Sequence, residues 1–180
     1  GQNETRPSKG VYRPDNTTGS TASAVAKHLG LTREQIQRGI QSVRPVEHRL
    51  QLLKTAGGVT VIDDAFNTNP TSSKEALKVL SSFPGRRVIV TPGMVELGED
   101  EAKYNEEFGR TMASAVDVAV LVGKKHTAPI HKGLTENGFP PENIHTVASL
   151  AEAVQTVNGI LRPGDVVMYE NDLPDHYNEG

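Results

Sequence analysis

The sequence predicts an α/β fold with a mostly parallel β-sheet and helices on both of its faces. Short runs of β-branched residues alternate with helical patterns through the last two thirds of the chain. The connections between them are short, and many contain glycine or proline. Such alternation is typical of parallel strands joined by right-handed crossovers through covering helices. At 180 residues the chain is long enough for one well-buried core with a small additional unit.

The composition excludes several classes of function. The net charge of −3 gives no argument for binding to nucleic acid or to an acidic membrane surface, and 4% aromatic residues without tryptophan disfavour a base-stacking platform. The absence of cysteine excludes disulfides, thiolate metal sites and cysteine nucleophiles. No apolar run approaches the roughly 20 residues that cross a bilayer, and no signal peptide is visible. We therefore expect a cytoplasmic protein with no membrane segment in this chain and no nucleic-acid partner.

The beginning of the chain is predicted to be separate from the sheet. Residues 1–18 are polar and contain prolines, which indicates a flexible lead-in. A helix is expected at 21–29, and Gly30 ends it. A second helix begins after Thr32, which has Gln35 at the spacing of a capping box, and Pro45 ends this helix. Residues 19–45 are therefore predicted to form a small helical hairpin.

The hydrophobic pattern predicts the elements of the sheet domain. Residues 48–54 alternate as a strand does, and a turn at 56–58 leads back into a β-branched strand at 59–63, so a hairpin is expected. Helical spacing and short apolar runs predict the other elements. The expected helices are 72–83, 101–116, 128–137 and 150–161, and the expected strands are 87–91, 118–122, 143–147 and 165–170.

Residues 59–70 form the richest candidate site. A buried strand ends there in Asp63 and Asp64, and an aromatic residue and two asparagines follow before Pro70. Ligands of parallel sheets bind beyond the carboxyl ends of the strands. A carboxylate accepts hydrogen bonds from ribose hydroxyls, an aromatic ring stacks on a base, and amides meet base edges. The pattern therefore favours a nucleotide, while a plain turn remains the alternative because Asp and Asn suit turns.

Two further strand ends are weaker candidates. Residues 91–98 place Glu96 between two glycines, which allows either a substrate-facing acid or an ordinary loop. Residues 123–127 are basic, and a solvated loop is the simpler interpretation. The chain has neither a P-loop pattern nor Gly-x-Gly-x-x-Gly, so any grip on phosphate must come from elsewhere. No histidine pair has metal-ligand spacing with a third ligand, so no metal site is expected in this chain.

Three motifs occur in order along the chain. They are Pro-Val-Glu-His-Arg-Leu-Gln at 45–51, Val-Ile-Asp-Asp-Ala-Phe-Asn-Thr-Asn-Pro at 61–70, and Gly-Met-Val-Glu-Leu-Gly at 93–98. Together they resemble the C-terminal part of the Mur ligase family, most closely its D-alanyl-D-alanine-adding branch. Three ordered motifs make a far more specific match than any one of them.

The resemblance implies a larger enzyme of which this chain is the end. Residues 19–45 would be the helical end of a central ATPase domain, and 46–180 would be the Rossmann-like C-terminal domain. The enzyme would be an ATP-dependent ligase that joins an amino acid or dipeptide to a carboxylate through an acyl phosphate, in peptidoglycan synthesis. Its cofactors would be ATP and Mg²⁺, with the P-loop and the main Mg²⁺ ligands in the upstream ATPase domain, so this fragment would be inactive alone. The alternative is a non-catalytic Rossmann-like module for nucleotide binding or interaction.

The resemblance also implies roles for individual residues, none of them catalytic in this fragment. The nucleotide-contacting positions are Arg49, Asp64, Phe66, Asn67 and Asn69. Among these, Asp64 would hold the ribose, Phe66 would lie against adenine and Arg49 would reach the nucleotide or its phosphates. The substrate-facing acids would be Glu96, Glu170 and Asp172. The last two lie where the family's adding enzymes have Lys-Gly-Ser, and acids at this place would suit a cationic amine substrate.

Overall fold

The structure is a computed structural model that describes residues 24–42, 50–55, 57–65 and 68–171. The chain divides into two compact units, Gly1–Val46 and Glu47–Gly180. In the first unit, residues 24–28 are helical and α2 spans Arg33–Ser42. The predicted capping box is present, because Thr32 N–H donates to Gln35 Oε1 at 2.8 Å and Gln35 N–H donates to Thr32 Oγ1 at 3.3 Å. Assigning this unit to the end of an ATPase domain stays a prediction.

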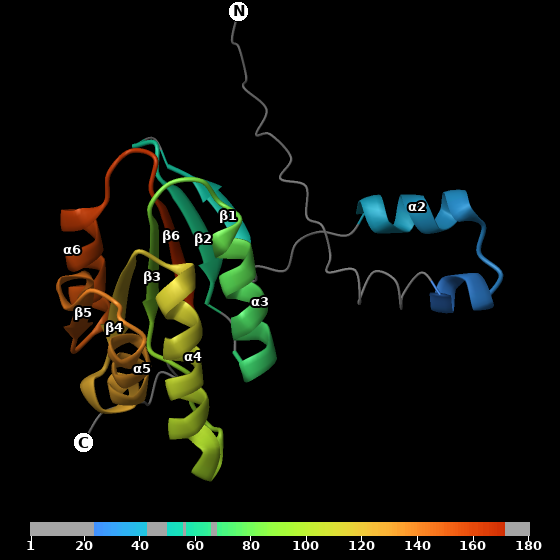
Figure 1. Cartoon of the computed structure of the whole chain (residues 1–180). Helices are drawn as coiled ribbons and strands as arrows, with labels where there is room; N and C mark the ends of the chain where they lie inside the picture. The colour runs from blue at the N-terminus through green and yellow to red at the C-terminus, as the bar shows by residue number, and fades with distance from the viewer. Residues whose placement is uncertain (1–23, 43–49, 56, 66–67, 172–180) are drawn as a thin grey trace, which may run out of the picture. The chain divides into compact units, whose positions relative to one another are not determined.

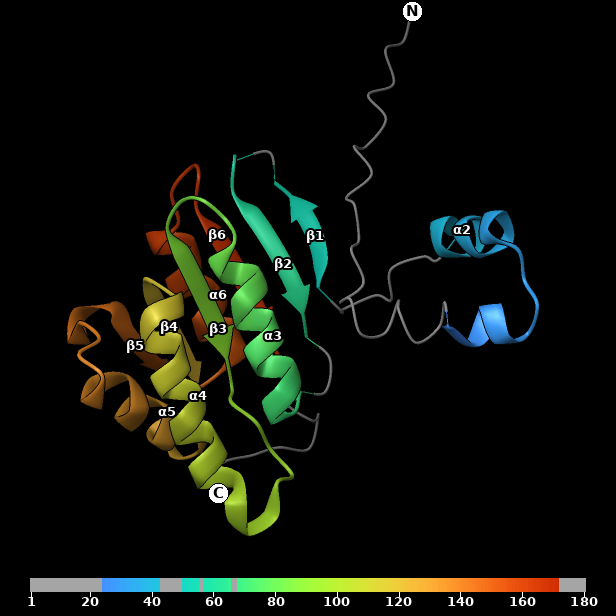
Figure 2. The same ribbon diagram turned by 45° about the vertical axis from the view of Figure 1, so that its right-hand side comes forward.

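The second unit contains a mostly parallel sheet, as predicted. Its strand order within the described residues is β1-β2-β6-β3-β4-β5 (Figure 1). Among the described strands, only β1 runs antiparallel to its neighbour, β2, with Leu53 opposite Val61. The strands are β1 (Gln51–Lys54), β2 (Thr60–Asp64), β3 (Arg87–Thr91), β4 (Val118–Val122), β5 (Ile144–Val147) and β6 (Val166–Glu170). The return of the chain to insert β6 between β2 and β3 brings the ends of three strands together (Figure 2).

Helices cover both faces of the sheet, but unequally. One core cluster joins the sheet to three helices, α3 (Pro70–Ser81), α4 (Glu101–Ala115) and α5 (Lys124–Glu136). The second cluster, on the other face, packs α6 (Leu150–Ile160) against β3, β4 and β6. The five-residue run of β4 is buried throughout, because helices cover both of its faces. The predicted two-sided α/β architecture is confirmed, and none of the described helices is long and apolar enough to span a bilayer.

Two helices begin earlier than the hydrophobic pattern predicts. Helix α3 starts at Pro70 because Asn69 caps it, and proline fits the first turn, where no backbone donor is needed. Helix α5 starts at Lys124, so the basic stretch 123–127 is a helix start and the prediction of a loop there is wrong. Gly123, at φ 89°, turns the chain directly from β4 into the helix. The polar first turn carries no apolar periodicity that would reveal it.

Glycines allow α4 and α5 to pack closely. A Cβ atom at Gly109 would lie 2.2 Å from the carbonyl oxygen of Ile130. A Cβ atom at Gly133 would lie 2.2 Å from the carbonyl oxygen of Glu106. Each helix thus presents a glycine to the backbone of the other, and the two axes approach more closely than larger residues would permit.

Candidate functional site

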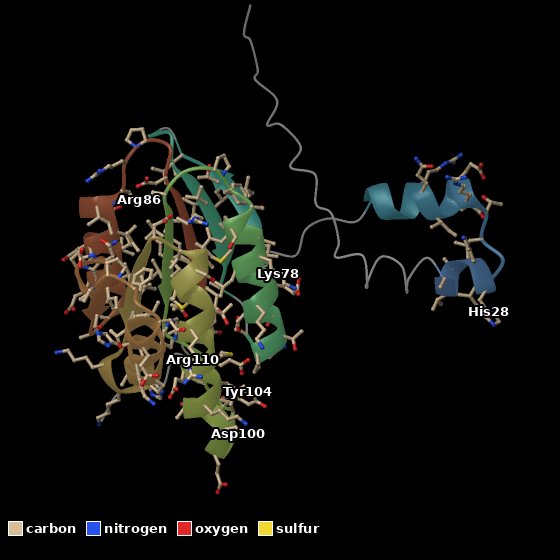
Figure 3. The ribbon with its side chains drawn as sticks, viewed as in Figure 1. His28, Lys78, Arg86, Asp100, Tyr104 and Arg110 are labelled. Carbon is tan, nitrogen blue, oxygen red and sulfur yellow. The ribbon has the colours of Figure 1, made fainter. Side chains whose placement is uncertain are left out.

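The carboxyl ends of β2, β6 and β3 lie side by side and form the candidate site. Asp64 is the register partner of Glu170, and the pairing of Val90 with Tyr169 places Thr91 on the other side of Glu170. Figure 3 shows Asp100 and Tyr104 toward this end of the domain and Arg86 at the opposite end. The side chains of Asp64, Glu170 and Thr91 thus lie at neighbouring strand ends, although their segments are far apart in the sequence.

Asp64 is largely buried at the end of β2, with 8% of its surface exposed. Its Oδ1 accepts a hydrogen bond of 3.0 Å from the backbone N–H of Leu50, just before β1. Its backbone oxygen accepts one of 3.2 Å from Asn171 N–H. Asp64 therefore fixes the edge strand, whether or not it also meets a ligand. Its contact with a ribose stays a prediction.

Glu170 differs from the expectation of an acid that faces a substrate. Its side chain has no exposed surface, because the strand points it into the sheet face that α3 covers. Oε2 accepts a hydrogen bond of 2.6 Å from Thr91 Oγ1, while Oε1 has no partner of normal geometry among the described residues. Burial raises the pKa of Glu170 to about 7, the Asp64 carboxylate adds to the rise, and the hydroxyls of Thr91 and Thr68 oppose it. In this conformation Glu170 is a buried acid poised to be neutral, and direct substrate contact would require the surrounding segments to move.

Asn171, which the sequence analysis missed, links two of the strand ends. It has a left-handed backbone with φ 61° and is 8% exposed. Its Oδ1 accepts a bond of 3.3 Å from Thr68 N–H, and its Nδ2 donates one of 2.6 Å to Gly93 O. Asn tolerates this backbone region better than most residues do. An asparagine directly after a buried strand was the signal available in the sequence.

The loop that follows β3, here called the β3 loop (92–97), is held in place by hydrogen bonds to helix α4. Fully buried Asn105 on α4 accepts Met94 N–H through Oδ1 and donates through Nδ2 to Met94 O, both at 2.8 Å. Gly93 has φ 82°, and a Cβ atom there would lie 2.8 Å from Asn105 Oδ1. Glu96 is exposed at the outer part of this loop, with φ 64°. Its exposure is compatible with the predicted substrate-facing role, which stays untested.

Asn69 is committed to helix capping. Its Oδ1 accepts hydrogen bonds of 3.0 Å from the N–H groups of Thr71 and Ser72, and Ser72 Oγ accepts Asn69 N–H at 2.9 Å. The side chain is exposed, so its amide nitrogen is the group that could still meet a ligand. The turn interpretation and the nucleotide interpretation of this residue are therefore compatible. The other predicted site residues, Arg49, Phe66, Asn67 and Asp172, lie outside the described residues.

A small hollow lies between α3 and α4 beside the β3 loop. Its volume of about 10 Å³ has room for one water molecule, so it cannot enclose a nucleotide. Its lining residues are Pro70, Ser73, Lys74, Met94, Tyr104, Glu107 and Phe108. Within the described ranges, no three acidic or histidine side chains gather as a metal-ligand group.

Comparison with known proteins decides the family. The model of the Mur ligase glutamate ligase domain matches residues 48–169, well over half of the chain. The chain belongs to the Mur ligase family. The matched range contains both the strand end at Asp64 and the β3 loop, so the motif resemblance found in the sequence is confirmed.

Individual Mur ligases agree with this assignment. The UDP-N-acetylmuramoyl-tripeptide–D-alanyl-D-alanine ligase of Mycobacterium leprae is 33% identical over 178 aligned residues, covering 88% of this chain and 34% of the relative. The structure of MurF from Acinetobacter baumannii superposes with a TM-score of 0.73 and 26% identity, covering 85% of this chain and 33% of that one. The MurF ligase of Thermotoga maritima, solved in complex with ADP, has the same fold, with a TM-score of 0.67 at 21% identity. The chain spans about a third of the length of these relatives.

Proposed function

We propose that residues 46–180 of this chain are the C-terminal domain of an ATP-dependent Mur-type ligase of peptidoglycan synthesis. The whole enzyme would join an amino acid or dipeptide to a carboxylate through an acyl phosphate, in the cytoplasm where ATP is available. The observation that carries the proposal is the family match over residues 48–169, which includes the ends of β2 and β3 in the candidate site. The length of the chain, about a third of its relatives, agrees with one domain of a larger enzyme.

The proposed role of this domain is to hold the adenosine side of ATP. Asp64 and Asn69 lie at the carboxyl end of β2, where parallel sheets bind ligands, and Arg49, Phe66 and Asn67 complete the predicted set. The complex of the Thermotoga maritima MurF ligase with ADP supports an adenine nucleotide. The sequence has no P-loop, and the described residues offer no Mg²⁺ ligand group. Phosphate and Mg²⁺ would therefore be bound by the upstream ATPase domain when the two domains close.

The proposed role of the β3 loop is to face the incoming amine. Glu96 is exposed there, whereas Glu170 is fully buried and bonded to Thr91. Of the three acids predicted to face the substrate, Glu96 and Asp172 are therefore the ones left to recognise a cationic amine. We therefore propose that a preference for a cationic amine, if the enzyme has one, depends on these two residues.

Two substitutions at Asp64 in the full-length enzyme test the nucleotide role. Asp64→Ala removes both the charge and the acceptor for Leu50 N–H, whereas Asp64→Asn keeps an oxygen for Leu50 and removes only the charge. A carboxylate that binds ribose hydroxyls predicts that both variants raise the KM for ATP, by roughly tenfold or more, the usual effect of losing a hydrogen bond to a charged group. ATP-dependent phosphate release would measure it. Unchanged ATP kinetics in both variants would contradict the proposal, and a rise in Asp64→Ala alone would show that only the link to Leu50 matters.

The amine is tested separately with the same enzyme. Phosphate release is measured with D-alanyl-D-alanine as the amine substrate. It is then measured with a dipeptide of equal length that carries a lysine side chain, and the KM values for the two dipeptides are compared. Recognition by acids predicts a lower KM for the lysine dipeptide and loss of that preference in Glu96→Gln. Efficient use of D-alanyl-D-alanine with no gain from the positive charge would exclude a cationic amine.

A further inference from the structure

The turn residues after β2 and the β3 loop are joined through the end of β6. Thr68 and Asn69 follow β2, and Gly93 and Met94 belong to the β3 loop. Asn171 lies between them and binds both backbones, Thr68 N–H through Oδ1 at 3.3 Å and Gly93 O through Nδ2 at 2.6 Å. We propose that Asn171 is a positioning residue that couples the nucleotide side of the site to the amine side. This inference rests on the proposed function, because the two sides are named from it.

The geometry of Asn171 favours transmission between the two segments. The side chain is 8% exposed, and its own N–H donates to Asp64 O at 3.2 Å, so its position is fixed by the end of β2. A single planar amide therefore joins both segments, and a shift of either backbone changes the hydrogen bond to the other. Leaving Thr68 N–H or Gly93 O without its hydrogen bond to Asn171 would cost stability, which opposes independent movement of the two segments.

Glu170 adds a parallel connection on the loop side. Gly93 N–H donates to Thr91 Oγ1 at 3.0 Å, and Thr91 Oγ1 donates to Glu170 Oε2 at 2.6 Å. Gly93 is thus held through its N–H by the Thr91–Glu170 pair and through its oxygen by Asn171. Both anchors come from consecutive residues, Glu170 at the end of β6 and Asn171 directly after it, so this part of the chain determines where the β3 loop begins.

The chemistry of the asparagine allows the two connections to be cut selectively. Asn171→Asp keeps an acceptor for Thr68 N–H and loses the donor to Gly93 O. Asn171→Gly loses both bonds while it retains the left-handed backbone that φ 61° requires. Asn137→Ala is the matched control, since Asn137 Nδ2 also donates to a backbone oxygen, that of Gly133, at the end of α5.

Amide hydrogen exchange of the 180-residue chain, followed by NMR, tests the connection without any ligand. In Asn171→Asp the Gly93 and Met94 amides should exchange roughly fivefold faster, the effect of one lost neutral hydrogen bond, while Thr68 is unchanged. In Asn171→Gly all three amides should exchange faster. Asn137→Ala should change none of them. Equal exchange of Gly93 and Met94 in the wild-type chain and in Asn171→Gly would overturn the proposal.

Kinetics of the full-length ligase then test the coupling itself, with ATP and D-alanyl-D-alanine as probes. If Asn171 couples the two sides, the KM for the dipeptide should depend on the ATP concentration in the wild-type enzyme, and Asn171→Asp, which cuts one of the two hydrogen bonds, should weaken that dependence by roughly threefold to tenfold. An unchanged dependence in Asn171→Asp, or a fall in kcat alone, would overturn the proposal. A wild-type enzyme without ligase activity would instead refute the proposed function, and the exchange data would still decide the link through Asn171.

Discussion

The hydroxyl of Thr91 donates a hydrogen bond of 2.6 Å to Oε2 of Glu170, where β3 and β6 end side by side. Both side chains are fully buried. Burial raises the pKa of Glu170 to about 7, and Oε1 lacks a partner of normal geometry among the described residues. A buried carboxyl group therefore changes its charge near neutral pH at the centre of the candidate site.

The raised pKa of Glu170 predicts a specific pH dependence of stability. The folded-state value of about 7 lies above the reference value of 4.5, so the folded chain binds more protons than the unfolded chain between these two pH values. The free energy of unfolding contributed by Glu170 should fall as pH rises through that window, by on the order of 3 kcal/mol. Glu170→Gln should abolish this contribution. Urea denaturation at about pH 5 and about pH 8 measures it in both proteins.

The comparison between the two proteins isolates Glu170 from the other titrating groups. Glu142→Gln, at an exposed position, is the control and should follow the wild-type pH dependence. Parallel curves for wild type and Glu170→Gln would show that Glu170 titrates normally.

The close packing of α4 and α5 predicts that Gly109→Ala is destabilising. The new methyl group would lie 2.2 Å from Ile130 O, which is backbone and cannot move aside cheaply. We expect a loss of about 1–3 kcal/mol or more in the free energy of unfolding. Gly159→Ala is the matched control, because Gly159 is in helix α6 and its Cβ would meet nothing within 4 Å. That substitution should be neutral or stabilising by about 0.5–1 kcal/mol, so equal thermal shifts in the two variants would contradict the packing.

The capping role of Asn69 can be separated from its predicted nucleotide role. Asn69→Ala removes the acceptor for Thr71 and Ser72 N–H and should lower the free energy of unfolding by about 1 kcal/mol. Asn69→Ser restores a good cap and should restore stability, but it lacks the amide nitrogen. If the amide meets the nucleotide, Asn69→Ser in the full-length enzyme raises the KM for ATP while thermal stability stays normal. Normal ATP kinetics would limit Asn69 to capping.

At the other end of the sheet, Arg86 and Asp165 form a largely buried ion pair. Arg86 Nη2 lies 2.7 Å from Asp165 Oδ2, and the Asp165 side chain is only 7% exposed. Arg86→Met leaves this carboxylate with Arg162 N–H, at 2.8 Å, and should cost about 2–4 kcal/mol, somewhat less than for a fully buried arginine. Lys78→Met, which breaks an exposed pair with Glu75, should have little effect. Similar denaturation midpoints for the two variants would contradict the importance of burial.

The sequence predicted the fold well because the fold depends on local patterns. The strands at 87–91 and 118–122 have the predicted bounds, since a short β-branched run between polar ends is readable without knowledge of its neighbours. The predicted start of α5 at residue 128 was wrong. The helix begins at Lys124, and its polar first turn depends on Gly123 rather than on apolar spacing. The site was predicted less completely: Asp64 was identified at a strand end, but its bond to Leu50 and the roles of Asn105 and Asn171 were not.

The sequence by itself determined the α/β class, the family and the segments that form the site, because each leaves a continuous signal in neighbouring residues. The tertiary structure alone decided which segment ends meet. The insertion of β6 between β2 and β3 places Glu170 beside Asp64 and Thr91, and no pattern within residues 165–171 encodes that neighbourhood. Because of this neighbourhood, Glu170, which was expected to face the substrate, has no exposed surface. The same neighbourhood places Asn171 between Thr68 and Gly93, where it links two segments. Charge and exposure depend on long-range packing, which a local pattern does not contain.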